Sequence, residues 1–233
     1  MQQSFQSLHL NRRKPMMAYI FIGILCFIFL ADRLTALIFG GSLSSYGLLS
    51  LYGMKINEAI SYAHQWWRIL TANFLHIEIW HILSNLLGIY IWGRYIELFY
   101  GRMRMALIMV LSGIAGVAAS YAFSASASLG ASAMIFGLYG ALLGIRKFDR
   151  NLFNATFGMQ IIFFIALTVI YGFTMSLVDN FGHIGGLIGG YLLSRAIGLY
   201  SEQMDTSARI IYSVAFLFFV GICCYIGYAG WPF

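Results

Sequence analysis

Two residue types that cooperate in hydrolytic enzymes stand within otherwise apolar stretches of the sequence, a serine and a histidine. Ser132 lies in a Gly-Ala-Ser-Ala segment, and His183 follows a Phe-Gly pair further along the chain. A serine hydroxyl is a weak nucleophile until a neighbouring base takes its proton, and an imidazole is a suitable base. The pair therefore predicts nucleophilic catalysis, with Ser132 as the nucleophile and His183 as its general base.

Hydrogen-bond donors for the charge that such a reaction creates lie in two further places. His81 and Asn85 are four residues apart, so on a helix they project from one face. Two adjacent donors can stabilise the negative oxygen of a tetrahedral intermediate. Gly130 and Ala131 precede Ser132 at the expected start of a helix, where backbone N–H groups lack intrahelical partners. The sequence thus predicts an oxyanion hole formed by His81, Asn85 and the backbone N–H of Ser132.

Small and aromatic residues indicate how the serine and the histidine could meet. Phe136 follows Ser132 by four residues and so lies on the same helix face. Gly186 follows His183 by three residues, which leaves that face nearly bare and lets a second helix pack closely in lipid. Such packing would bring the His183 ring within reach of Ser132 and stack it on Phe136. The nearest carboxylate, Asp179, lies in the preceding loop, so we expect a dyad rather than a triad.

The elements that must position these residues are transmembrane helices. Hydrophobic residues make up 61% of the 233 residues and charged residues only 9%, whereas about 25% charged is usual for a soluble domain. So little charge cannot cover a water-facing surface, and the composition predicts an all-α polytopic membrane protein. The net charge of +6 does not indicate nucleic-acid binding, because the basic residues form short clusters between apolar runs, as in cytoplasmic loops.

A helix that crosses the hydrocarbon core needs about 20 mostly apolar residues. The runs that qualify are residues 16–39, 81–99, 103–123, 132–145, 157–178, 183–197 and 210–229. The fourth and sixth are short and rich in Gly and Ala, which predicts that they lie centrally, shielded from lipid by the others. We divide the chain into a polar cytoplasmic tail (1–14), a six-helix core (15–200) with an interfacial first loop (40–75), and an added C-terminal transmembrane helix (201–233).

The basic residues indicate how the helices are oriented. If the N-terminus is cytoplasmic, most of them lie on the inner side, as the positive-inside rule requires. These residues are Arg12, Arg13, Lys14, Arg94, Arg102, Arg104, Arg146, Lys147, Arg150, Arg195 and Arg209. Only Arg33, Lys55 and Arg68 then lie outside. The even-numbered helices then begin at the outer face, so Ser132, His183, His81 and Asn85 share one depth. Their common depth predicts a single polar cavity toward the extracytoplasmic side.

Other chemistry fits the sequence poorly. His76 and His81 are five residues apart, which places them on different helix faces, and their segment lacks the H-E-x-x-H pattern of zinc proteases. The cysteines, which lie within apolar runs without metal-ligand spacing, are Cys26, Cys223 and Cys224. They are expected to be small packing residues, and we expect neither a metal nor a cofactor. Taken singly, Ser132 or Asn85 could be a helix-packing residue, and their common depth is what favours one catalytic site.

These residues and their order resemble the rhomboid family of intramembrane serine proteases, over roughly residues 65–190. The matching motifs are Trp67-Arg68, Phe74-Leu75-His76, His81-Ile82-Leu83-Ser84-Asn85, Gly130-Ala131-Ser132, Ile135-Phe136-Gly137-Leu138-Tyr139-Gly140 and Gly182-His183-Ile184-Gly185-Gly186. Each motif alone is weak, whereas their order, spacing and helix positions are specific together.

The resemblance implies a six-helix rhomboid core with one added helix, and an endopeptidase that cleaves transmembrane segments of single-pass proteins near the outer face. It implies that Trp67 and Arg68 mark a membrane-embedded first loop, where we expect Arg68 to anchor the loop rather than touch substrate. We likewise expect His76 to bond neighbouring backbone. One position departs from the family pattern, because Ala133 stands where a glycine often follows the serine. Its methyl group could crowd the site but removes no catalytic group.

Two other functions fit parts of the sequence. A non-catalytic rhomboid-like protein would bind transmembrane helices without cutting them, but such relatives typically lack the serine or the histidine. A small transporter would often show inverted repeats or broken helices, which we do not find. Loss of cleavage in a Ser132→Ala variant would separate the protease from both. The expected partners are transmembrane protein substrates and the lipid bilayer of a plasma membrane, with no nucleic acid and no metal.

Overall fold

The computed structural model describes residues 14–39, 45–174, 178–199 and 205–230, and most of them are helical. The predicted tail, residues 1–14, lies outside the described residues except for Lys14. The longer elements are α2 (Met17–Phe39), α8 (Arg102–Phe123), α9 (Ser132–Phe148), α11 (Gly158–Gly172), α12 (Asn180–Ile197) and α13 (Thr206–Gly230). The shorter ones are α3 (Ser45–Tyr52), α4 (Asn57–Ser61), α5 (Arg68–Thr71), the 3-10 helix η1 (Ala72–Phe74), α6 (Ile79–Gly88), the π-helical turn η2 (Ile89–Gly93), α7 (Arg94–Tyr100) and α10 (Arg150–Thr156).

Helices occupy all the apolar runs predicted from the sequence. The second run is built from α6, η2 and α7 in succession, and the fifth ends early because α11 stops at Gly172. By length and composition, α2, α8 and α13 qualify as membrane spans, and the bent pair formed by residues 68–74 and 79–100 adds a fourth if it counts as one span. The number of spans therefore stays a prediction.

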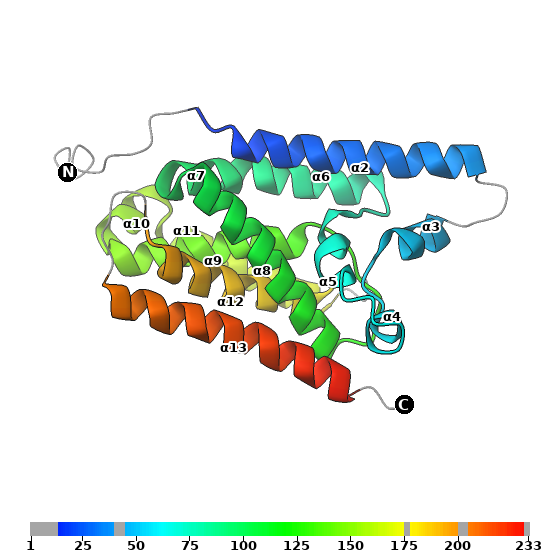
Figure 1. Ribbon diagram of the computed structural model, residues 1–233. Coiled ribbons are helices and arrows are strands. Elements are labelled where there is room, and N and C mark those ends of the chain that lie inside the picture. Colours follow the sequence, from blue (N-terminus) through cyan, green and yellow to red (C-terminus); the bar gives the residue numbers. More distant parts are fainter. Residues whose placement is uncertain (1–13, 40–44, 175–177, 200–204, 231–233) are drawn as a thin grey trace.

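The central helices are α9 and α12, as expected for short helices rich in small residues. Every residue of α9 from 133 to 142 is buried. Helix α8 packs against both central helices, and α13 packs against α12 and α8 (Figure 1). The outer helices instead expose large apolar side chains, such as Phe27 on α2, Phe163 on α11 and Leu217 on α13. Apolar surface of this extent requires lipid, so the fold is that of an all-α multi-pass membrane protein.

The contact between α9 and α12 depends on glycine. A Cβ atom at Gly186 would overlap the carbonyl of Ala133, and one at Gly190 would overlap the carbonyl of Gly137. The two backbones therefore approach as closely as small residues permit in lipid. This contact holds together the first turns of α9 and α12, which carry the predicted nucleophile and base.

The first loop, between α2 and α6, contains short helices rather than an extended chain. The Arg68 side chain is buried and donates hydrogen bonds to the carbonyls of Ser50 and Met54 and to the side-chain oxygen of Gln65. Arg68 thus anchors this loop, as predicted. Trp67 beside it is 55% exposed, which suits an aromatic residue at a membrane interface.

At the other end of the bundle, Glu97 connects α7 to the start of α2. Its carboxylate accepts hydrogen bonds from the backbone N–H groups of Met16, Met17 and Ala18 at distances of 2.7, 3.1 and 3.1 Å. The first N–H groups of a helix lack intrahelical partners. A buried carboxylate there caps α2 and complements its dipole, so Glu97 fixes the outermost helix of the core against α7.

Candidate active site

The predicted nucleophile and base lie in the first turns of the two central helices. Ser132 begins α9 and is partly exposed, while His183 lies in the first turn of α12 and is 9% exposed. The His183 ring stacks on Phe136, with 4.2 Å between the ring centroids and 8° between the planes. Because Phe136 lies one turn from Ser132 on α9, this stacking holds the imidazole beside the helix face that carries the serine.

Among the described residues, no carboxylate accepts a hydrogen bond from the His183 ring. Its Nδ1 has no hydrogen-bond partner in that part of the chain. The carboxylate of Asp179 instead accepts a hydrogen bond from the backbone N–H of Gly182 at 3.0 Å, which makes Asp179 the N-cap of α12. Stacking on Phe136 therefore orients the imidazole.

His81 and Asn85 lie beside the segment that precedes the serine. A Cβ atom at Gly130 would be 2.5 Å from His81 Nε2 and 3.7 Å from Asn85 Nδ2, and Gly130 has a φ of +121°. Only glycine suits both this backbone and this space. Asn85 is buried, and its Nδ2 donates to the carbonyl of His81 at 3.1 Å. The structure thus brings both side chains to the backbone that leads into Ser132.

His76 supports this arrangement from the loop before α6. Its Nε2 accepts a hydrogen bond from the backbone N–H of Ala131 at 3.4 Å. Its ring lies edge-on to that of His81, with 5.0 Å between the centroids. The prediction that His76 bonds neighbouring backbone is therefore confirmed. The sequence does not reveal the partner, because no helical spacing relates residue 76 to residue 131.

Lys55 contributes to the site's surroundings in a way that the sequence does not signal. Its backbone forms two hydrogen bonds with Ser128, of 2.9 and 3.1 Å. Its Nζ donates to the carbonyls of Ser124 and Ser126 at 2.7 and 2.8 Å. Burial lowers the pKa of Lys55 to about 8, because a desolvated ammonium loses its hydration. Lys55 thus ties the first loop to the segment between α8 and α9, which leads to Ser132.

Of the other supporting residues predicted from the sequence, the two glycines lie at the candidate site and the two first-loop residues do not contact it through the bonds described above. Gly186 lies at the contact of the two central helices, and Gly130 lies against His81. The hydrogen bonds of Arg68 stay within the first loop, and Trp67 is largely exposed. None of these hydrogen bonds therefore connects Trp67 or Arg68 to Ser132 or His183.

Comparison with known proteins gives this multi-pass bundle its family. The Rhomboid domain matches residues 63–200, a stretch that contains the serine, both histidines and the asparagine of the candidate site. The match extends over more than half of the chain, and the chain belongs to the rhomboid family.

Individual relatives agree with this assignment. The chain is 37% identical over 212 residues to Rhomboid protease GluP of Bacillus subtilis. The aligned stretch covers 88% of this chain and 41% of that protein. It is 34% identical over 153 residues to RHOMBOID-like protein 1 of Arabidopsis thaliana, in an alignment that covers 64% of this chain and 39% of that protein. It is also 37% identical over 134 residues to Inactive RHOMBOID-like protein 8 of the same plant, in an alignment that covers 56% of this chain and 38% of that protein. The chain therefore spans about two fifths of the length of these relatives.

Proposed function

We propose that this protein is an intramembrane serine endopeptidase that cleaves transmembrane segments of single-pass membrane proteins. The observation that carries the proposal is the stacking of His183 on Phe136, one helical turn from Ser132. Family membership supports it, because a relative with 37% identity is named a rhomboid protease. The fold supports it as well, because the bundle exposes apolar helices to lipid, where such a substrate would lie.

In the proposed reaction, the hydroxyl oxygen of Ser132 attacks the carbonyl carbon of the scissile peptide while His183 takes the hydroxyl proton. The carbonyl oxygen becomes negative and accepts hydrogen bonds from His81, Asn85 and the backbone N–H of Ser132. The carbon–nitrogen bond then breaks, and the imidazolium gives its proton to the leaving amine. Water, deprotonated by His183, hydrolyses the acyl-enzyme and the proton returns to Ser132.

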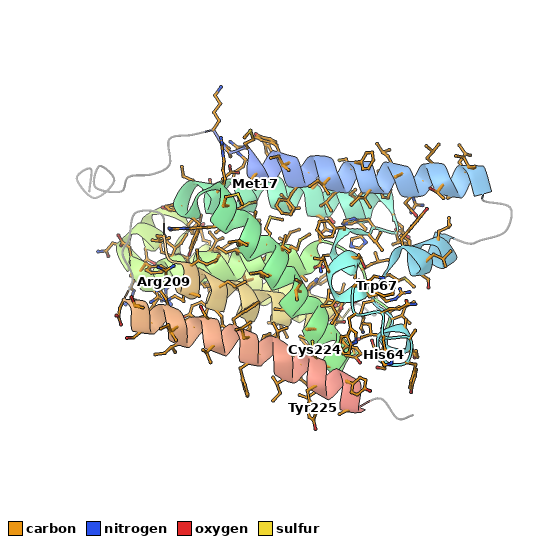
Figure 2. The ribbon with its side chains drawn as sticks, viewed as in Figure 1. Met17, His64, Trp67, Arg209, Cys224 and Tyr225 are labelled. Carbon is orange, nitrogen blue, oxygen red and sulfur yellow. The ribbon has the colours of Figure 1, made fainter. Side chains whose placement is uncertain are left out.

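We place the N-terminus in the cytoplasm and the candidate site toward the extracytoplasmic side of a plasma membrane. Met17 and Arg209 lie toward one end of the bundle and Trp67 toward the other (Figure 2). The segment before α9 lies at the Trp67 end, since Gly130 donates a backbone hydrogen bond to Ala72 of the first loop. Most basic residues lie in the loops of the opposite end, which favours a cytoplasmic position for that end.

A second candidate function is non-catalytic binding of transmembrane helices. Inactive RHOMBOID-like protein 8 is 37% identical to this chain over 134 residues, so membership of the family does not by itself imply cleavage. The presence of Ser132 and His183 on adjoining helix turns favours the protease.

Cleavage of a purified transmembrane test substrate in detergent and in liposomes separates the two functions. We expect Ser132→Ala and His183→Ala each to lose activity by about 10³-fold or more. A fluorophosphonate probe should label Ser132 in the wild-type protein and leave His183→Ala unlabelled, because the hydroxyl is then not activated.

The matched controls are a serine and a histidine away from the site. Ser213→Ala changes an exposed serine on α13, and His64→Asn changes an exposed histidine with a φ of 53° that asparagine tolerates. Both should cleave at the wild-type rate. Full cleavage by Ser132→Ala would refute the proposed protease, and capture of the substrate helix without cleavage by wild-type protein would establish the second candidate.

A further inference from the structure

A basic pocket lies at the inner ends of the central helices. It has a volume of about 470 Å³ and is lined by Leu143, Arg146 and Lys147 of α9, Arg150 of α10, Ile162 of α11 and Tyr191 of α12. Three of these residues are cationic and none is acidic; Asp149, which is near them in sequence, does not line the pocket. Arg146 follows Ser132 by fourteen residues on one helix, so the pocket lies about 21 Å from the candidate active site along α9.

The guanidinium groups at this end have buried nitrogens without partners. Arg146 Nε, and Nε and Nη1 of Arg195 on α12, are buried and make no hydrogen bond within the described part of the chain. Among the residues that the structure describes, neither arginine forms an ion pair with a carboxylate, and neither does Lys147 or Arg150. A buried charged group without a partner is unfavourable. Arg146 is the one of these two arginines that lines the pocket, so an anion bound in the pocket would offset its charge.

Arg195, which does not itself line the pocket, is held in place by ring contacts that leave its donors free. The Arg195 guanidinium carbon lies 4.0 Å from the ring centroid of Phe148 and 5.4 Å from that of Tyr212. Stacking on two rings fixes a guanidinium without using its N–H groups. A guanidinium presented in this way suits the oxygens of a phosphate group.

We propose that this pocket binds the phosphate-bearing headgroup of an anionic phospholipid, with phosphatidylglycerol as the test lipid. Arg146, Lys147 and Arg150 would hold the phosphate, and Leu143 and Ile162 provide the apolar wall along which the acyl chains leave. A soluble phosphate would not need that wall. Basic pockets between transmembrane helices at the membrane surface bind such headgroups. The binding does not depend on peptide-bond cleavage.

Native mass spectrometry of the protein released from nanodiscs tests the proposal. Wild-type protein should retain one phosphatidylglycerol molecule and should not retain phosphatidylcholine. The triple variant Arg146→Gln/Lys147→Gln/Arg150→Gln should bind it about 100-fold more weakly, because each cation near an anionic surface changes affinity about fivefold. Lys147→Gln alone changes an exposed residue that should not affect folding, and it should weaken binding by about fivefold.

The matched control is Arg12→Gln/Arg13→Gln/Lys14→Gln, which removes the same charge from the N-terminal segment of the sequence. It should retain the lipid within about twofold of wild type. Equal retention of the two lipids by wild-type protein, or equal losses in the two triple variants, would overturn the proposal. So would an increase in melting temperature with inorganic phosphate as large as that with short-chain phosphatidylglycerol, because the ligand would then be a soluble phosphate. Lys147→Gln and the wild-type lipid preference decide the question if the triple variant does not fold.

Discussion

Gly116 of α8 lies behind the contact between α9 and α12, and replacing it by alanine tests whether this packing positions the proposed dyad. A Cβ atom at residue 116 would be 2.5 Å from the carbonyl oxygen of Gly182 and 2.6 Å from the Cβ of Ala133. Ordinary van der Waals contact begins near 3.4 Å. One or both central helices would therefore have to move by about 1 Å.

The two atoms that would be displaced belong to neighbours of the proposed catalytic residues. Ala133 follows Ser132, and Gly182 precedes His183. A misplacement of about 1 Å can lower a reaction rate about 100-fold, whereas overpacking a core destabilises it by about 1–3 kcal/mol. We therefore expect Gly116→Ala to lower kcat about 100-fold, with little change in KM and a folded protein.

The assay is the initial rate of cleavage of a fluorogenic transmembrane substrate, with thermal unfolding of the same samples. Gly221→Ala on α13 is the control, because a Cβ atom there meets nothing within 4 Å. Gly116→Ala/Ala133→Gly removes one of the two overlaps and should recover part of the lost rate. A Gly116→Ala variant with wild-type kcat and wild-type stability would refute the reasoning.

Three further predictions concern the proposed oxyanion donors, the buried Lys55 and the Glu97 cap of α2. His81→Ala and Asn85→Ala should each lower kcat by about 10²–10³-fold in the same cleavage assay, because each removes a proposed oxyanion donor; an unchanged kcat would exclude that donor. Lys55→Met should lower the free energy of unfolding by about 1–3 kcal/mol, because it removes the buried ammonium that donates to the part-buried carbonyls of Ser124 and Ser126. The pKa of Lys55 is about 8 in the folded protein, against an ordinary value of 10.5, so the unfolded chain binds more protons between these two pH values. The stability advantage of wild type over Lys55→Met should therefore widen as pH rises through this window. Thermal unfolding of both proteins across this range measures the difference, and a difference that narrows would contradict the lowered pKa of Lys55. Glu97→Gln should lower stability by about 1 kcal/mol in thermal unfolding, because it removes the charged cap of α2, and wild-type stability would show that the cap contributes nothing.

The tertiary contacts around the site lay beyond the reach of sequence patterns. Lys55 pairs with Ser128, and His76 accepts from the backbone of Ala131. Neither pairing follows a helical period, since each joins a loop to a loop across the bundle. The short helices of the first loop were likewise not predicted, because elements of four to eight residues are too short to show a hydrophobic period.

The sequence by itself determined the class of the protein and the residues of the candidate site. Apolar runs long enough for helices, small residues on one face and a few polar residues at one depth are local patterns, and local patterns survive in the sequence. Ser132, Phe136 and His183 could be related because helical spacing and charge-based orientation each act within one segment or one loop. Only the tertiary structure decided the angle at which rings meet, the partner of each buried donor and the cations that share a pocket, because those depend on how separate helices pack.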